Sequence, residues 1–140
     1  GNDFPRVEQR TLQKNLSNVH LAGVLGREEI VEVYRKADIL FAQLDASFSS
    51  AVPSKLYEYL ATGLPVVYGG AGEAARFLSS FENVFLFTPG DLSSLEKALA
   101  GALSVHSTSR KNQRVIESQY LREVQSEKYV PVLQTLTESK

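Results

Sequence analysis

"AVPSKLYEYLATGLPVVYGG", residues 51–70, is the stretch that decides how this chain folds. Its first half carries Pro53 and then apolar residues at helical spacing as far as Thr62, which predicts a helix over 53–62. Its second half is the apolar run "LPVVY" followed by two glycines, which predicts a strand and a tight turn. The stretch therefore contains one helix-to-strand unit.

The same alternation continues upstream of this stretch. Asp3 and Pro5 are suited to the start of a first helix. The run "NVHLAG" (18–23) predicts a short buried strand, and residues 27–36 place Ile30, Val31 and Tyr34 on one helical stripe. The run "ADILFAQL" (37–44) is continuously apolar, which is typical of a parallel strand covered on both faces.

Downstream, the pattern becomes progressively helical. We expect a helix at about 73–80, the strand "NVFLF" (83–87), a helix at 91–104, a polar break at 106–113 and an amphipathic stretch to about residue 137. Four short strands, each followed by a helix, predict an α/β fold with an open parallel sheet, helices on both faces and C-terminal helices.

Composition excludes several kinds of protein. The 140 residues include no cysteine, so disulfides, thiolate metal sites and cysteine nucleophiles are ruled out, as suits a reducing compartment. With 15 basic and 16 acidic residues mixed along the chain, no field attracts nucleic acid. No apolar run approaches the roughly 20 residues that span a bilayer, and the first residues lack signal-peptide features. We therefore expect a soluble, cytoplasmic protein.

The chain is expected to be one domain, residues 1–140, and an amino-terminally truncated piece of a longer protein. It has no methionine at its start or anywhere else, and it opens on "GND", which are loop and helix-capping residues.

The helix expected at 53–62 separates an apolar side from a polar side. At about 100° per residue, Pro53, Leu56, Tyr57 and Leu60 share one side. The opposite side holds Ser54, Lys55, Glu58, Tyr59 and Thr62.

Ser54, Lys55 and Glu58 are neighbours near the amino end of this helix, where free N–H groups and a partial positive charge favour an anion. In an open α/β sheet this end lies at the carboxyl edge of a strand, where such folds bind ligands. The alternative interpretation is an ordinary solvated helix face with a Lys55–Glu58 surface pair.

The order of motifs in "NVHLAGVLGREEIVEVYRKADILFAQL" (18–44) and "PSKLYEYLATGLPVVYGGAGEAARFL" (53–78) resembles a known enzyme family. It is similar to the nucleotide-sugar-binding, carboxyl-terminal domain of retaining glycosyltransferases of the GT-B fold (family 4-like, glycosyl transferases group 1). The resemblance covers essentially the whole chain, and the form "PSKLYEYLATG" resembles the bacterial branch that builds surface polysaccharides. The matching positions are Asn18, Val19, Gly23, Ala37, Asp38, Glu58, Ala61, residues 63–67, Gly72 and Glu73.

The resemblance implies a role for each candidate site residue. Glu58 would accept hydrogen bonds from the ribose hydroxyls of the donor nucleotide, which suits a carboxylate with two acceptor oxygens. The amides that open its helix, at Ser54 and Lys55 after Pro53, would meet the diphosphate. The loop Gly23, Val24, Leu25 and Gly26 would offer backbone groups to the base.

Two departures from the family pattern affect catalysis. The family places a further glutamate eight positions before Glu58, where it helps to hold the donor sugar or to steady the reacting centre, and here Ser50 stands at that catalytic position. Either the loop "DASFSS" (45–50) handles the sugar, with Asp45 as a candidate substitute, or catalysis is weakened. The upstream segment that supplies an Arg and a Lys for the diphosphate is missing, as is the amino-terminal acceptor-binding domain. The chain alone is therefore expected to bind donor weakly and to transfer nothing.

Other candidates for chemistry have simpler interpretations. The glycine-rich turn before Glu73 lacks the third glycine of a dinucleotide fingerprint. His20 and His106 have no metal-ligand spacing, and the serines at 47–50 lack the Gly-x-Ser-x-Gly turn of a hydrolase. The charged C-terminal residues are interpreted as a solvated helix face.

We expect the donor-binding part of a glycosyltransferase that moves a sugar from a nucleoside-diphosphate sugar to a glycan or lipid-linked acceptor. The resemblance implies no cofactor and no metal, and it is compatible with peripheral association of the full-length protein with the inner membrane face. Two alternatives remain open: a non-catalytic nucleotide-sugar-binding or partner-binding module of the same fold, and a sugar-nucleotide epimerase.

Overall fold

The computed structural model of the protein describes residues 3–127. The chain divides into two compact units, Gly1–Lys36 and Ala37–Lys140. The part of the amphipathic stretch expected at 128–137 lies outside the described residues.

The first unit contains two helices, α1 (Phe4–Gln13) and α2 (Arg27–Lys36), as the sequence predicts. Asp3 precedes α1, but its carboxylate forms an ion pair with Arg6 (3.1 Å) instead of capping the helix. At the start of α2 the Glu29 carboxylate accepts a hydrogen bond from the Gly26 backbone N–H at 2.6 Å. This contact is one half of a capping box and fixes where α2 begins.

The strand predicted at 18–23 is wrong. These residues are irregular and almost entirely exposed, with Val19 37% exposed. A strand needs a neighbour for its backbone N–H and C=O groups, and none of the described strands pairs with this segment. An apolar run favours a buried strand, but it does not provide the neighbouring strand that must pair with it. The described residues therefore form three strands instead of the four that the sequence predicts.

The second unit is built on a parallel sheet of β1 (Leu40–Gln43), β2 (Val66–Gly69) and β3 (Val84–Phe87). The strands are ordered β1-β2-β3, with Leu40 beside Val66 and Val66 beside Val84. All four residues of the central strand are buried, which accounts for its continuous apolar sequence.

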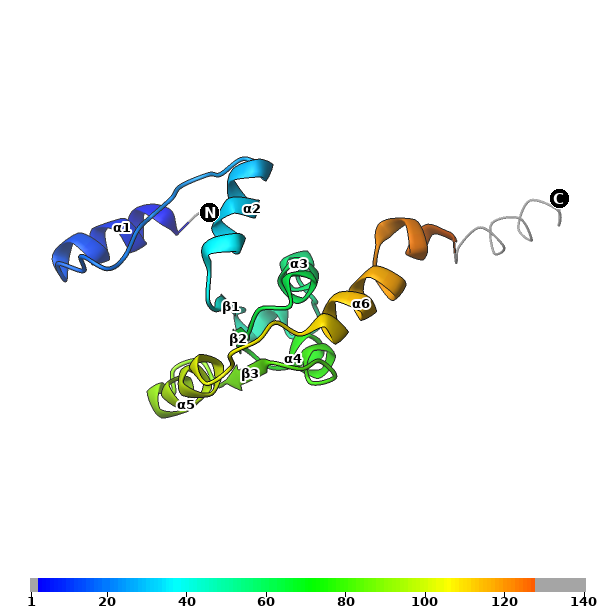
Figure 1. The fold of residues 1–140 in the computed structure, drawn as a ribbon. Coiled ribbons are helices and arrows are strands. Elements are labelled where there is room, and N and C mark those ends of the chain that lie inside the picture. Colours follow the sequence, from blue (N-terminus) through cyan, green and yellow to red (C-terminus); the bar gives the residue numbers. More distant parts are fainter. Residues whose placement is uncertain (1–2, 128–140) are drawn as a thin grey trace, which may run out of the picture. The chain divides into compact units, whose positions relative to one another are not determined.

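Helices cover both faces of this sheet (Figure 1). On one face, α3 (Ser54–Thr62), α4 (Glu73–Leu78) and α6 (Arg110–Gln119) enclose a core around Leu56, Leu60 and Tyr68. On the other face, α5 (Leu92–Leu103) packs against Val67 and Phe87. The predicted α/β class, with an open parallel sheet flanked by helices and ending in C-terminal helices, is confirmed.

One residue of α3 faces the opposite way from the helical projection. Tyr59 was expected on the polar side, but it is 8% exposed, and its hydroxyl donates to the Phe41 carbonyl oxygen at 3.3 Å. The buried stripe of α3 is Leu56, Tyr59 and Leu60, at spacing i, i+3, i+4. Tyr57 lies instead on the flank of the helix, half-buried.

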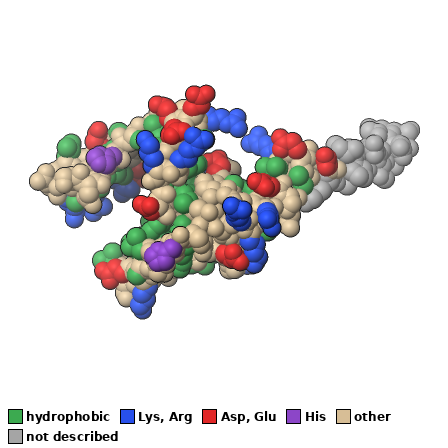
Figure 2. Space-filling model, viewed as in Figure 1, with side chains coloured by type: hydrophobic (Ala, Val, Ile, Leu, Met, Phe, Trp, Pro, Cys, Tyr) green, Lys and Arg blue, Asp and Glu red, His purple; other side chains and the backbone are tan. Residues whose placement is uncertain are grey.

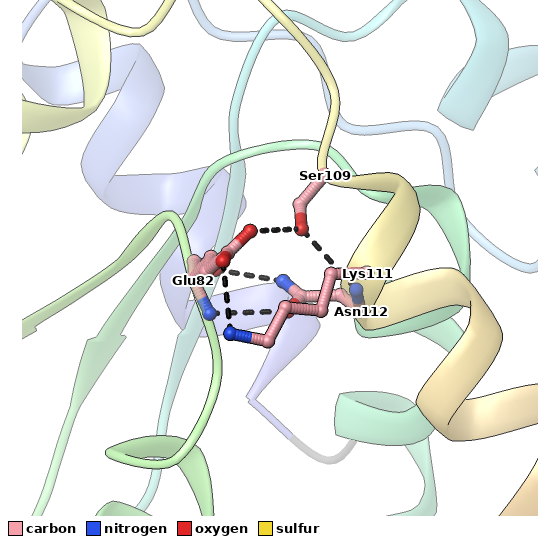
Figure 3. Close-up of polar contacts among 4 residues, drawn as sticks. All are labelled: Glu82, Ser109, Lys111 and Asn112. Atoms are coloured by element: carbon pink, nitrogen blue, oxygen red, sulfur yellow. Dashed lines mark hydrogen bonds and ion pairs between the residues drawn. The ribbon is translucent and has the colours of Figure 1, made fainter.

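The helix α6 begins inside the polar break expected at 106–113. Ser109 caps it by accepting a hydrogen bond from the Asn112 N–H at 3.2 Å. The Asn112 amide is buried and exchanges two hydrogen bonds with the Glu82 backbone, at 2.7 and 3.0 Å (Figure 3). The polar residues therefore anchor the helix to the segment before β3.

Candidate functional site

The loops after β1 and β2 are joined at the carboxyl edge of the sheet. The Glu73 N–H donates to the Ser49 carbonyl oxygen at 2.8 Å. Gly72 adopts φ +76°, and a Cβ there would lie 2.0 Å from that same oxygen. Only glycine allows this approach, so the loop that carries Ser50 is fixed against the start of α4.

Within this loop the Asp45 side chain has a structural role. It caps the short 3₁₀ helix η1 (Ala46–Phe48) by accepting hydrogen bonds from the N–H and the hydroxyl of Ser47, at 3.0 and 2.7 Å. The hydroxyl bond, then the N–H bond, lowers the pKa of the Asp45 carboxyl.

The start of α3 follows the same loop. Pro53 has extended backbone and occupies the N-cap position, and Ser54 and Lys55 are the first two helical residues, both exposed. The first N–H groups of a helix have no acceptor within it, and they carry its partial positive charge. Glu58 lies one turn further on, also exposed. Burial and then the nearby Glu58 carboxylate raise the pKa of Tyr59.

α3 and α6 run antiparallel, and two hydrogen bonds join them at one end. The Ser109 N–H donates to the Gly63 carbonyl oxygen at 2.8 Å, and the Gln113 amide donates to the Thr62 carbonyl oxygen at 3.0 Å. At the other end the rings of Tyr57 and Tyr120 are 5.4 Å apart. The amino end of α3 therefore faces the carboxyl end of α6.

A pocket of about 580 Å³ lies between these two helices. Ser54 and Glu58 line it from α3, while Lys55, Pro53 and Ser50 are not among its lining residues. The residues that line it are Ser54, Tyr57, Glu58, Ala61, Ile116, Tyr120, Leu121, Arg122 and Gln125. The structure thus brings two of the predicted site residues together in one cavity.

Aromatic rings form the wall behind this pocket. Tyr57 contacts Phe77 at 4.9 Å between ring centroids, and Phe77 contacts Tyr120 at 5.5 Å and Phe81 at 5.0 Å. Burial, and secondarily the neighbouring Tyr120 phenol, raises the pKa of Tyr57. Aromatic pairs at these separations contribute about 0.5–1.5 kcal/mol each beyond the area that they bury, so they stabilise this wall.

The predicted base-binding loop belongs to the first unit. Gly23 has φ +71°, Leu25 is half-buried, and Gly26 donates its N–H to Glu29. The other predicted site residues, which follow β1, belong to the second unit.

Sequence reasoning missed Tyr57, Tyr120 and Arg122 as pocket residues. Tyr57 was assigned to the core by helical projection, and the C-terminal charges were interpreted as a solvated face. Neither Tyr57 on α3 nor Tyr120 at the end of α6 belongs to a recognisable sequence motif. Only the pairing of α3 with α6 brings these residues to one cavity.

The charge distribution, the length of the helices and the grouping of possible metal ligands are further features of the described residues. On the face drawn in Figure 2, acidic and basic side chains are interspersed within each unit. None of the helices in the described range is both long and apolar enough to cross a membrane. Residues 3–127 also contain no group of three or more His, Cys, Asp or Glu side chains that could hold a metal ion.

The fold and the pocket define a class: an open parallel α/β protein with a cavity along the helix that follows the first strand of its sheet. A family model described as "Glycosyl transferases group 1" matches residues 1–104. The chain belongs to this family, and glycosyl transfer is therefore its general reaction class. Searches of curated proteins and of solved structures found no match.

Proposed function

We propose that the chain is the donor-binding part of a glycosyltransferase that moves a sugar from a nucleoside-diphosphate sugar to a glycan or lipid-linked acceptor. The observation that carries this proposal is that Ser54, at the amino end of α3, and Glu58, one turn further on, line one pocket. Family membership supplies the reaction class, and these two residues supply chemistry suited to a nucleotide.

Glu58 orients the donor in this proposal. An ionised carboxylate accepts two hydrogen bonds, and a ribose offers two adjacent hydroxyl donors. Glu58 is exposed on α3 and lies in the pocket, so it is accessible to a ligand.

The first turn of α3 stabilises the leaving group. When the bond between the anomeric carbon and the phosphate oxygen breaks, negative charge grows on the diphosphate. The N–H groups at Ser54 and Lys55 and the Lys55 ammonium are suited to that charge because they are positive. The anomeric carbon then bonds to the oxygen of an acceptor hydroxyl, whose proton is released. Pro53 sets the start of this turn.

The remaining assignments follow from the family resemblance. Gly23, Leu25 and Gly26 contact the base, and Ser50 stands at the position nearest the donor sugar. The proposal includes retention of anomeric configuration, the carboxyl-terminal half of a GT-B enzyme, and a bacterial polysaccharide pathway. It also includes action without a metal, and a cytoplasmic location at the inner face of the membrane.

The amino-terminal acceptor domain completes the enzyme in this proposal. A helix terminus contributes about 1 kcal/mol and a charged hydrogen bond about 1.5–3 kcal/mol. Their sum of about 2.5–4 kcal/mol corresponds to roughly millimolar affinity at best. This chain alone therefore binds donor weakly and transfers nothing.

The test is titration of nucleoside diphosphates and their sugars into the full-length protein, comparing Glu58→Gln with wild type. We expect an affinity loss of about tenfold for Glu58→Gln, the cost of one charged hydrogen bond. Glu117→Gln is the control, because Glu117 is exposed on α6 and is not a pocket residue. Unchanged affinity and rate in Glu58→Gln would exclude the role of Glu58.

Turnover assays separate the alternatives. Sugar transfer to a glycan or lipid-linked acceptor supports the proposal. Nucleotide-sugar binding without turnover supports a non-catalytic module. Isomerisation of the donor sugar without an acceptor, followed by NMR, supports an epimerase.

A further inference from the structure

The wall of the pocket opposite α3 is formed by the end of α6 and the residues after it. After Tyr120 the chain bends at Leu121 and continues as helix over 122–127. Arg122 and Gln125 from this segment line the same pocket as Ser54 and Glu58. Residues far apart in the sequence thus face one cavity.

Arg122 is the basic residue among those that line the pocket, and Glu58 is the acidic one. Within residues 3–127, the ion pairs join Arg6 to Asp3, Arg35 to Glu32, Arg76 to Glu73 and Lys111 to Glu82, and none includes Arg122. Arg122 is also exposed. Its guanidinium is thus available to an anion that enters the cavity.

We infer that Arg122 binds the diphosphate of the donor from the wall opposite the start of α3. This inference rests on the proposed function and adds a residue to it. A guanidinium is always charged, and its planar fork of N–H donors matches two phosphate oxygens at once. The ligand class is a nucleoside diphosphate or its sugar conjugate.

The surroundings of Arg122 are partly apolar. Ile116, 3% exposed, and the rings of Tyr57 and Tyr120 form apolar walls on one side of the cavity. Arg122 itself is exposed, so its contact with an anion remains sensitive to salt. The Ser54 end of α3 adds a partial positive charge to the same cavity.

Arg122 lies beyond residues 1–104, which match the family model. Its position depends instead on α6, which Asn112, Ser109 and Gln113 hold in place. The anion-binding contribution of this segment is therefore a feature of this chain's own C-terminal part.

The test compares a nucleoside diphosphate with its nucleoside in the full-length protein, without acceptor. UDP, GDP and ADP are titrated first, and the one that wild type binds best is used with its parent nucleoside. Arg122→Gln is expected to weaken the diphosphate at least tenfold, to leave the nucleoside unchanged, and to reduce the salt dependence of binding. Arg122→Lys is expected to fall between wild type and Arg122→Gln.

Arg114→Gln is the charge-matched control, because Arg114 is exposed on α6 and does not line the pocket. Equal diphosphate affinity in Arg122→Gln and Arg114→Gln, with a loss in Glu58→Gln, would overturn this inference and leave the proposed function standing. Equal weakening of diphosphate and nucleoside by Arg122→Gln would also overturn it. Failure of wild type to bind any nucleotide would overturn the proposed function itself.

Discussion

The Gly63 carbonyl oxygen accepts a hydrogen bond from the Ser109 N–H at 2.8 Å, and this contact joins the end of α3 to the start of α6. Gly63 is in the left-handed region (φ +73°), and a Cβ there would lie 2.9 Å from the Ser109 carbonyl oxygen. The two helices that enclose the pocket are therefore held together where a glycine is required.

Gly63→Ala is expected to destabilise the protein by more than the roughly 1–2 kcal/mol that a left-handed alanine costs, because the methyl group also meets Ser109. Gly90→Ala is the matched control: Gly90 has φ +89° but no atom within 4 Å of its Cβ position. Urea unfolding measures both variants. Equal losses of stability in the two variants would show that the close approach of Ser109 to Gly63 adds nothing to the cost of a left-handed alanine.

Asn112→Ala is expected to cost about 1–3 kcal/mol, because it leaves the Glu82 N–H and carbonyl without their side-chain partners in a part-buried site. Glu117→Ala, at an exposed position of the same helix, should change stability by less than about 0.5 kcal/mol. Denaturant titration distinguishes them. A cost for Asn112→Ala no larger than that of Glu117→Ala would contradict the anchoring role.

The Glu82 carboxylate should make stability depend on acid pH. Its hydrogen bonds with Lys111 (3.0 Å) and Ser109 (2.9 Å) lower its pKa below the ordinary 4.5. Because the folded pKa is the lower one, this contribution is complete above pH 4.5 and is lost as pH falls through the folded value.

Glu82→Gln should therefore reduce the loss of stability between neutral pH and pH 3, although it lowers stability at pH 7. Urea unfolding across this pH range measures the difference from wild type. Glu96→Gln, at an exposed position of α5, is the control. A pH profile parallel to that of wild type would show that the Glu82 contacts do not form in solution.

Tyr68→Phe should leave stability unchanged or raise it by up to about 1 kcal/mol. The Tyr68 hydroxyl is buried, and it has no hydrogen-bond partner among the described residues. An unpaired buried hydroxyl is costly, so its removal does no harm.

Tyr59→Phe is the comparison, because its hydroxyl donates to the Phe41 carbonyl oxygen. This variant should lose about 0.5–1.5 kcal/mol. Thermal unfolding of both variants and of wild type measures the two changes in stability. A larger loss in Tyr68→Phe than in Tyr59→Phe would mean that the Tyr68 hydroxyl is satisfied.

The sequence predicted those parts of the fold that depend on local patterns. The helix after Pro53 and the three described strands form within a few residues of their expected bounds, because apolar spacing and turn residues act over short distances. The strand predicted at 18–23 does not form, because a strand depends on a partner strand that its own residues do not specify. The prediction that Tyr59 lies on the polar side of α3 was wrong, because its hydrogen bond to Phe41 in the sheet cannot be inferred from the helix alone.

The candidate site divides in the same way. The shared exposed position of Ser54 and Glu58 could be predicted, because both lie in one helix with a recognisable start, and their role in donor binding stays a prediction. Arg122 and Tyr120 could not, since they reach the pocket only through the pairing of α6 with α3. Tyr120 and Arg122 lie in a charged stretch of sequence, and no local pattern there indicates that they line a cavity.

The antiparallel pairing of α3 and α6 also has a mechanical consequence. The hydrogen bonds at Gly63 and Gln113 hold one end of the helix pair, and the nine residues of α3 extend about 13 Å from that end. A tilt of about 10° between the two helices would displace the Ser54 end by about 2 Å. Leu56 and Leu60, both fully buried beneath α3, oppose such a tilt, so the packing of α3 on the core sets the width of the pocket mouth.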